Sequence, residues 1–278
     1  MTTYVQRLNA AAARNGSLLC VGLDAEPGKL PAHLQALPAP EAMLAFNREI
    51  IDATCDVVAA YKPNLAFYEA LGPAGMEAFR ATVAHVPHGI PVIADAKRGD
   101  IDNTTRAYAR AIFDVYGCDA ITANPYLGRD ALAPFLDRAD RGTYILCRTS
   151  NPGAADIAEL DVAGEPLYVR VAERAPTWTT HGNIGLVVGA TAPAQLARVR
   201  AVAPGVPILL PGVGAQGGDL AASMAAGLDA TGAGLLVVAA RQVMYASSGR
   251  DFAEAARAAA RQLRDQIESA RANAAPAR

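Results

Sequence analysis

Short apolar runs recur along the chain, and each is followed by a polar or Gly/Pro-rich turn and then by a stretch with helical spacing. Their continuous apolar character predicts strands of a parallel sheet that is covered on both faces. The intervals of 23 to 41 residues between successive runs leave room for a crossover helix after each strand. The eight runs begin near Ser17, Asp56, Ile90, Cys118, Gly142, Asn183, Val206 and Gly232.

Eight strand-and-helix units predict a (β/α)8 TIM barrel, formed by a single domain that spans residues 1–278. The widest gap between strands predicts a loop insertion around 151–182 with a helix near 167–175, and a last amphipathic helix follows Asp251. The tail, 272–278, is expected to fray. A doubly wound open sheet is the alternative, but the GxGxxG fingerprint that it favours after an early strand is missing. Further helical spacing covers 41–54, 74–85, 104–116, 192–202 and 215–226.

Composition narrows the function to a small-molecule partner. Hydrophobic residues make up 52% of the chain and charged residues 19%, which is typical of a folded protein with a large core. A net charge of -2 gives no positive field to attract nucleic acid or an anionic membrane. No apolar run approaches the roughly 18 residues of a membrane span. The opening segment MTTYVQRLNAAAARNG lacks the apolar stretch of a signal peptide, so we expect a cytoplasmic protein.

The cysteines and histidines do not form a recognisable site. The four cysteines are far apart with no CxxC pair, and the four histidines show neither an HExxH motif nor a cluster with cysteine. We interpret the cysteines as small core residues rather than disulfide partners or metal ligands. A metal-free mechanism is therefore favoured.

Polar side chains gather where the predicted strands end. In a TIM barrel the catalytic groups come from the carboxyl ends of the strands and from the loops that follow them. Taken singly, each of these residues could be a surface residue or a helix N-cap, but together they converge on one rim. In chain order they are Asp24, Lys62, Asn64, Asp95, Lys97, Asn124, Thr149, Ser150, Thr191, the segment PGVGAQGGD and Arg241.

The segment IADAKRGDI is the strongest local signal. Asp95 and Lys97 are two apart on a strand and share a face, and Asp100 follows just past the strand end. The three can form an alternating charge array, to which Lys62 of the neighbouring strand adds a second cation. A structural salt-bridge layer is the other interpretation, but coupled titrating groups of this kind are typical of active sites. The chain has only three lysines against 22 arginines, which favours a lysine that must give up a proton.

A second group of residues predicts a phosphate site. The segment PGVGAQGGD surrounds Gln216 with glycines that expose main-chain N–H groups. Arg241, at the tip of the next strand, can bind two phosphate oxygens at once. The loops after strands seven and eight are the usual phosphate site of this fold.

At these positions the sequence resembles the orotidine 5'-phosphate decarboxylase family, in its larger bacterial subgroup. The resemblance covers most of the chain in order, and the family's Asp-x-Lys-x-x-Asp motif is matched within DAKRGDIDNT. The other matching segments are VGLD with Asp24, YKPNLAFYE with Lys62, TSNPGA with Ser150, PGVGAQGGD with Pro211 and Gln216, and VVAARQVMYA with Arg241.

The resemblance implies decarboxylation of orotidine 5'-phosphate to uridine 5'-phosphate, with Lys97 as the proton donor and Asp95 facing the substrate carboxylate. It implies no metal and no organic cofactor. It implies a homodimer with shared active sites, in which Asp100 comes from the partner subunit and Thr104 lies near the ribose. The remaining matches would bind the substrate: Asp24 and Lys62 the ribose hydroxyls, Ser150 the pyrimidine edge, and Pro211, Gln216 and Arg241 the phosphate end.

Two positions depart from the family pattern. Asp102 stands where Pro or Gly is common, and Ala240 stands where Gly commonly precedes the arginine. Two alternative functions remain open. One is a related Mg²⁺-dependent sugar-phosphate decarboxylase or aldol enzyme built on the same motif, although the segments PNLAFYEALG and TSNPGA fit the pyrimidine enzyme better. The other is a non-catalytic nucleotide-binding barrel, against which the complete Asp/Lys/Asp set argues.

Overall fold

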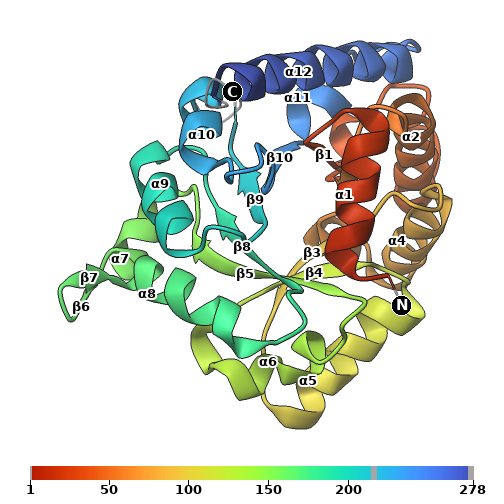
Figure 1. Ribbon diagram of the computed structural model, residues 1–278. Coiled ribbons are helices and arrows are strands. Elements are labelled where there is room, and N and C mark those ends of the chain that lie inside the picture. Colours follow the sequence, from red (N-terminus) through yellow and green to blue (C-terminus); the bar gives the residue numbers. More distant parts are fainter. Residues whose placement is uncertain (1, 214–217, 275–278) are drawn as a thin grey trace.

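The computed structural model describes residues 2–213 and 218–274, which form a parallel β-barrel surrounded by helices (Figure 1). Around the barrel the strand order is β2-β1-β10-β9-β8-β5-β4-β3, and two bridges, Tyr61 with Val92 and Asn64 with Asp95, join β2 to β3. The predicted TIM barrel is therefore confirmed. The eight barrel strands are β1 (Leu19–Gly22), β2 (Ala60–Lys62), β3 (Ile93–Arg98), β4 (Ala120–Ala123), β5 (Gly142–Arg148), β8 (Ile184–Val188), β9 (Ile208–Pro211) and β10 (Leu235–Ala239).

Helices occupy the stretches predicted at 41–54, 74–85, 104–116 and 192–202, and the fifth stretch differs from the prediction. The spacing over 215–226 predicts too early a start, because α10 (Leu220–Gly227) begins only after Asp219, whose side chain caps it by accepting from the N–H of Ala222. Residues 214–217 lie outside the described part of the chain. The four predicted stretches correspond to α2 (Ala39–Thr54), α4 (Gly72–His85), α5 (Asp102–Ala109) continued by a π-helical segment (Arg110–Val115), and α9 (Pro193–Val202). Three short helices lie outside the five predicted stretches: α3 (Leu65–Glu69), α6 (Arg129–Leu136) and α11 (Arg241–Met244).

The segment between β5 and β8 is the longest interruption of the barrel pattern. It contains α7 (Ala155–Ala158), a hairpin of β6 (Asp161–Val162) and β7 (Glu165–Pro166), and α8 (Leu167–Arg174). The hairpin projects from the side of the barrel (Figure 1). Arg148, at the end of β5, donates to the carboxylate of Glu159 at 2.8 Å and so ties this segment to the rim.

One end of the barrel is closed by α1 (Tyr4–Asn15), a helix that the sequence analysis does not predict (Figure 1). Tyr4 and Leu8 pack against the side chains inside the barrel, and the hydroxyls of Tyr4 and Tyr144 lie 3.0 Å apart. Only glycine fits at position 142, because a Cβ there would lie 2.5 Å from the ring of Tyr4. Since α1 fills this end, a ligand has access to the barrel from the opposite, carboxyl end of the strands.

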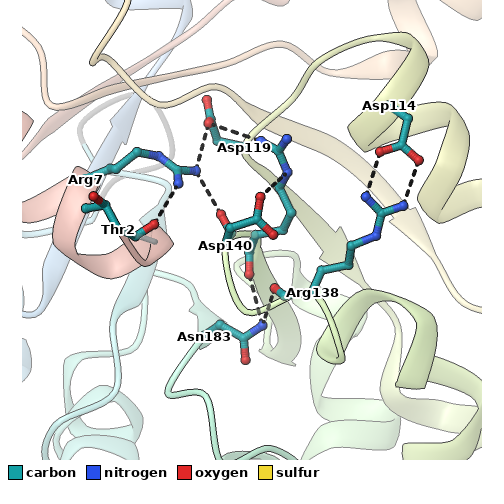
Figure 2. Close-up of polar contacts among 8 residues, drawn as sticks. Thr2, Arg7, Asp114, Asp119, Arg138, Asp140 and Asn183 are labelled. Atoms are coloured by element: carbon teal, nitrogen blue, oxygen red, sulfur yellow. Dashed lines mark hydrogen bonds and ion pairs between the residues drawn. The ribbon is translucent and has the colours of Figure 1, made fainter.

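Polar contacts fix the loops around α1 (Figure 2). A guanidinium nitrogen of Arg7 donates to the carboxylate of Asp119 at 2.9 Å and to the main-chain oxygen of Asp140 at 2.9 Å. The amide of Asn183 donates to three main-chain oxygens of the loop before β5. These polar groups are occupied with one another, which indicates a structural role for this end.

The last helix, α12 (Phe252–Ala274), packs against α2 and α10. It includes residues 272–274, the first part of the expected tail, while 275–278 lie outside the described residues. Arg271 donates to the main-chain oxygen of Gly232, which holds the helix to the barrel near its end. No helix in the described part of the chain is long and apolar enough to cross a membrane.

Candidate active site

A cavity of about 500 Å³ opens at the carboxyl ends of the strands. Apolar side chains of Phe67, Leu146, Val187 and Leu209 form part of its wall. Two of the predicted site residues, Asp100 and Thr104, do not line it, and Gln216 lies outside the described residues. The structure brings the other seven together: Asp24, Lys62, Asp95, Lys97, Ser150, Pro211 and Arg241.

The carboxylate of Asp95 bridges two lysines. Lys62 Nζ donates to Oδ2 of Asp95 at 2.7 Å, and Lys97 Nζ donates to Oδ1 at 2.5 Å. The side chains of Lys62 and Asp95 are only 6% and 12% exposed, whereas that of Lys97 is 50% exposed. One ammonium is therefore buried beneath the carboxylate, and the other is presented to the cavity.

Both members of the buried pair stay charged. Burial by itself would raise the pKa of Asp95, but Lys62 and Lys97 outweigh it and hold that pKa well below its usual range. Burial likewise would lower the pKa of Lys62, but Asp24 and Asp95 outweigh it and raise that pKa. Lys62 therefore acts as a fixed cation near neutral pH, and Lys97 is the lysine placed to exchange a proton with a ligand.

Asp24 lines the cavity and has an unsatisfied acceptor. Its Oδ1 is buried and has no hydrogen-bond partner among the described residues. Burial raises the pKa of Asp24 by more than the nearby Lys62 lowers it. Because buried polar atoms in proteins are rarely left unpaired, this oxygen is suited to accept from a hydroxyl of a ligand.

Strand β3 is irregular where it carries Lys97. Its register against β4 shifts between Ala94 and Arg98, and Lys97 has a positive φ of +50°. A left-handed conformation costs a residue with a Cβ roughly 1–2 kcal/mol. Asp95 and Lys97 meet as expected, but at a bulge rather than along a regular strand.

Thr122 is a site residue that the sequence analysis does not identify. Its hydroxyl accepts from the main-chain N–H groups of Ala96 and Lys97 and donates to Oδ1 of Asp95. A threonine is ordinary in a β-strand, so its type alone indicates nothing. The available signal is one hydroxyl in an otherwise apolar four-residue strand, AITA, which follows the strand with the charged motif.

Ser150 reaches the cavity because Gly189 lacks a side chain. A Cβ at position 189 would lie 2.7 Å from the Cα of Ser150 and 2.8 Å from its main-chain nitrogen. The hydroxyl of Thr191 donates to the main-chain oxygen of Ser150 at 3.3 Å. The residues at the ends of β5 and β8 thus support one another beside the cavity.

The predicted phosphate end contains Pro211, Gly212 and Arg241. None of the ion pairs formed by the described residues involves Arg241, so its charge is available to a ligand. The departure at Ala240 has a physical explanation. A Cβ at Gly22 would lie 2.7 Å from the Cβ of Ala240, so the missing side chain at Gly22 makes room for that methyl group.

Asp100 is not part of the charge array within this chain. Its Oδ1 accepts from the N–H of Ile101 at 2.8 Å, and in the described residues Lys97 forms an ion pair with Asp95 but not with Asp100. Asp102, the second departure, has a φ of +42°. Glycine adopts this conformation freely, and Asp tolerates it better than most residues.

Two other predicted rim residues have structural roles. The side chain of Asn64 accepts from the N–H of Ala66 and caps α3, and that of Asn124 accepts from the N–H of Tyr126. For these two, the helix N-cap interpretation is correct.

The four cysteines are free, and Cys20, Cys118 and Cys147 are buried as predicted, whereas Cys55 is half-buried. Among the described residues, no three or more His, Cys, Asp or Glu side chains are grouped so that they could hold a metal ion.

Comparisons with known proteins point to one family. Residues 17–259 match the model of the orotidine 5'-phosphate decarboxylase / HUMPS family. A relative from Thermomicrobium roseum named orotidine 5'-phosphate decarboxylase is 53% identical over 272 residues, which cover 97% of this chain and 96% of the relative.

Solved structures agree with the sequence comparison. The Leishmania donovani OMP decarboxylase is 43% identical with a TM-score of 0.86, over 97% of this chain and 99% of that one. The Leishmania donovani UMP synthase is 44% identical with a TM-score of 0.88 over 98% of this chain, which spans 57% of the length of that protein.

Proposed function

The chain belongs to the orotidine 5'-phosphate decarboxylase / HUMPS family and converts orotidine 5'-phosphate to uridine 5'-phosphate in pyrimidine synthesis, and from that premise we propose how its residues act. Breaking the bond between the ring and the carboxylate releases CO2 and leaves the electron pair on a ring carbon. The Lys97 ammonium stabilises this carbanion and then donates a proton to it. The resulting neutral amine regains its proton from solvent, to which Lys97 is half exposed.

The observation that carries this proposal is the carboxylate of Asp95 held between two ammonium groups. A charge that is already oriented needs no reorganisation when the carbanion forms, and one such group is typically worth about 3–4 kcal/mol of the barrier. Asp95 also faces the substrate carboxylate, whose negative charge it repels until CO2 leaves. Lys62 keeps Asp95 ionised throughout, because its own pKa is raised.

The rest of the cavity binds the nucleotide. Asp24 and Lys62 bind the ribose hydroxyls, which is supported by the unpaired Oδ1 of Asp24. Ser150 binds the pyrimidine edge from the end of β5. Pro211 and Gln216 bind the phosphate end of the nucleotide, and Arg241 binds two of the phosphate oxygens.

The first test is loss of orotate absorbance by the purified protein, with and without EDTA. We expect turnover of orotidine 5'-phosphate in both conditions, and no turnover by Lys97→Ala, which should still bind uridine 5'-phosphate. Near-normal decarboxylation by Lys97→Ala would refute the role of Lys97. Loss of activity on chelation would favour the Mg²⁺-dependent alternative.

A homodimer with shared sites completes this proposal. Asp100 would reach Lys97 of the partner subunit, and Thr104 would lie near the partner's ribose. The loops after β3 and β4 support an interface there, because Ile101 is 62% exposed and Tyr126 is 87% exposed. The test mixes Lys97→Ala with Asp100→Ala, both inactive alone. We expect activity to return when subunits exchange, and no return after demonstrated exchange would exclude the cross-subunit role of Asp100.

We also propose that the enzyme is cytoplasmic, because its four free cysteines fit a reducing compartment. Cell fractionation tests this: decarboxylase activity confined to a membrane or exported fraction would contradict it.

A further inference from the structure

The hydroxyl of Thr122 contacts three groups on strand β3, next to the Lys97 ammonium. Its Oγ1 accepts from the main-chain N–H of Ala96 at 3.1 Å and of Lys97 at 3.0 Å, and it donates to Oδ1 of Asp95 at 3.0 Å. A threonine hydroxyl has one proton and two lone pairs, so these contacts use its full capacity. Thr122 is 2% exposed, so its side chain has little freedom to exchange these partners for water.

Two of these bonds stabilise the bulge that presents Lys97. The register between β3 and β4 shifts between Ala94 and Arg98, and Lys97 has a left-handed backbone. A strained conformation of this kind persists only where its surroundings hold it. The hydroxyl of Thr122 supplies that restraint, because it binds the N–H groups of both Ala96 and Lys97 on the neighbouring strand.

The third bond orients the shared carboxylate. Oδ1 of Asp95 receives both Lys97 Nζ and the hydroxyl of Thr122, while Oδ2 receives Lys62 Nζ. Because both oxygens accept hydrogen bonds, the carboxylate cannot rotate without losing one. Thr122 therefore fixes Lys97 at two places: directly at its main-chain N–H, and through Asp95 at its Nζ.

We propose that Thr122 is a positioning residue for the decarboxylation, which holds the backbone of Lys97 and the carboxylate of Asp95 in register. The inference rests on the proposed role of Lys97 as proton donor. Thr122 acts through Lys97 and Asp95, so its loss affects the chemical step more than the binding of the nucleotide.

The test compares Thr122→Val, which keeps the shape and removes the hydroxyl, with Thr122→Ser, which keeps the hydroxyl. For Thr122→Val we expect kcat to fall about 10- to 100-fold. KM and the Kd of uridine 5'-phosphate should change less than about threefold, since neither reports on the proton donor. Thr122→Ser should retain kcat within about threefold of the original enzyme. Rates are expressed per folded site, counted by binding of uridine 5'-phosphate.

Thr143 provides a matched control. It is a buried threonine on the adjacent strand β5, and its hydroxyl has no hydrogen-bond partner among the described residues. Thr143→Val therefore removes a buried hydroxyl of the same kind away from Lys97, and we expect kcat to stay within about twofold. If Thr122→Val fails to fold, Thr122→Ala and Thr122→Ser still differ by a single hydroxyl and give the same comparison.

Several results would overturn the inference. A kcat for Thr122→Val equal to that of the original enzyme would do so, as would equal losses in Thr122→Val and Thr122→Ser. Lys97→Ala in the same assay distinguishes failure of the role of Thr122 from failure of the role of Lys97. If Lys97→Ala is inactive while Thr122→Val is fully active, only the role of Thr122 fails; if Lys97→Ala is active, the role of Lys97 itself fails.

Discussion

Replacing Asp95 with Asn tests whether one carboxylate holds the centre of the site together. The substitution keeps the size of the side chain but removes the charge that lies 2.7 Å from Lys62 Nζ and 2.5 Å from Lys97 Nζ. The buried ammonium of Lys62 then loses its hydrogen-bonded counter-charge. Removing one partner of a buried pair typically costs about 3–5 kcal/mol of stability.

The lower end of that range applies, because Asp24 still lies near Lys62 and raises its pKa. We therefore expect Asp95→Asn to lower the free energy of unfolding by about 3 kcal/mol, measured by urea denaturation at pH 7 with far-UV circular dichroism. For a chain of this size the corresponding fall in Tm is about 6–12 °C. Turnover should fall at least about a hundredfold, since Lys97 loses the group that orients it.

The stability that Asp95 contributes depends on pH in a direction set by its pKa. The pKa of Asp95 is depressed in the folded protein, so its stabilising contribution is fully present above the carboxyl pKa of the unfolded chain, which is near 4. It is lost as the pH falls toward the folded-state pKa. The stability difference between the original protein and Asp95→Asn should therefore be constant from about pH 5 to 8 and should narrow below about pH 4.

Asp114 offers a control for the same substitution in an exposed pair. Both of its carboxylate oxygens accept from Arg138, at 2.6 and 2.7 Å (Figure 2). The two side chains are 44% and 35% exposed, so Asp114→Asn should cost no more than about 1 kcal/mol. If Asp95→Asn is as mild as Asp114→Asn, the buried pair of Asp95 and Lys62 does not stabilise the fold and the reasoning fails.

Three further substitutions test other parts of the molecule. Arg241→Ala should raise KM at least about tenfold and lower kcat at saturation by less, because the lost charge binds a remote phosphate; an unchanged KM with lost turnover would contradict that role. Gly189→Ala should raise KM without changing the circular dichroism spectrum, since the new methyl would displace Ser150, and an unaltered KM would show that the loop tolerates it. Arg7→Ala should lower the free energy of unfolding by about 1–2 kcal/mol, because it removes the bond to Asp119 (Figure 2). Its kcat should stay unchanged, since neither Arg7 nor Asp119 lines the cavity, and an altered kcat would show that the closed end of the barrel affects the chemical step.

The barrel is predictable because both faces of its sheet are buried, and each strand is therefore a continuous apolar run in the sequence. The first and last residues of a strand are harder to predict where its apolar run extends into a turn. The run that begins near Asp56 enters β2 only at Ala60, because the preceding residues complete the turn that ends α2, with the N–H of Val57 donating to Thr54. Helix α1 is hard to predict for another reason: its few large apolar residues join a core only when the closed barrel gives them a surface to pack against.

The candidate site likewise contains residues that the sequence predicts and residues that it does not. Asp95, Lys97 and Lys62 are predictable because charged residues at the ends of buried strands are unusual and have few structural uses. The role of Thr122 depends on a bulge in the neighbouring strand, and no alternation of apolar and polar residues reports a register shift. The position of Asp100 relative to Lys97 could not be derived from spacing either, because the chain turns away after β3 and leaves Asp100 outside the cavity.

The helix that closes the barrel, α1, also constrains the order in which the chain folds as it is synthesised. Tyr4 meets Tyr144, which lies 140 residues further along the sequence, so helix α1 cannot complete its packing until β5 has been synthesised. Until then Tyr4 and Leu8 lack part of the surface that they cover in the closed barrel. This end of the barrel is therefore sealed only after β1 to β5 have been made, although the sealing helix precedes all of them in the sequence.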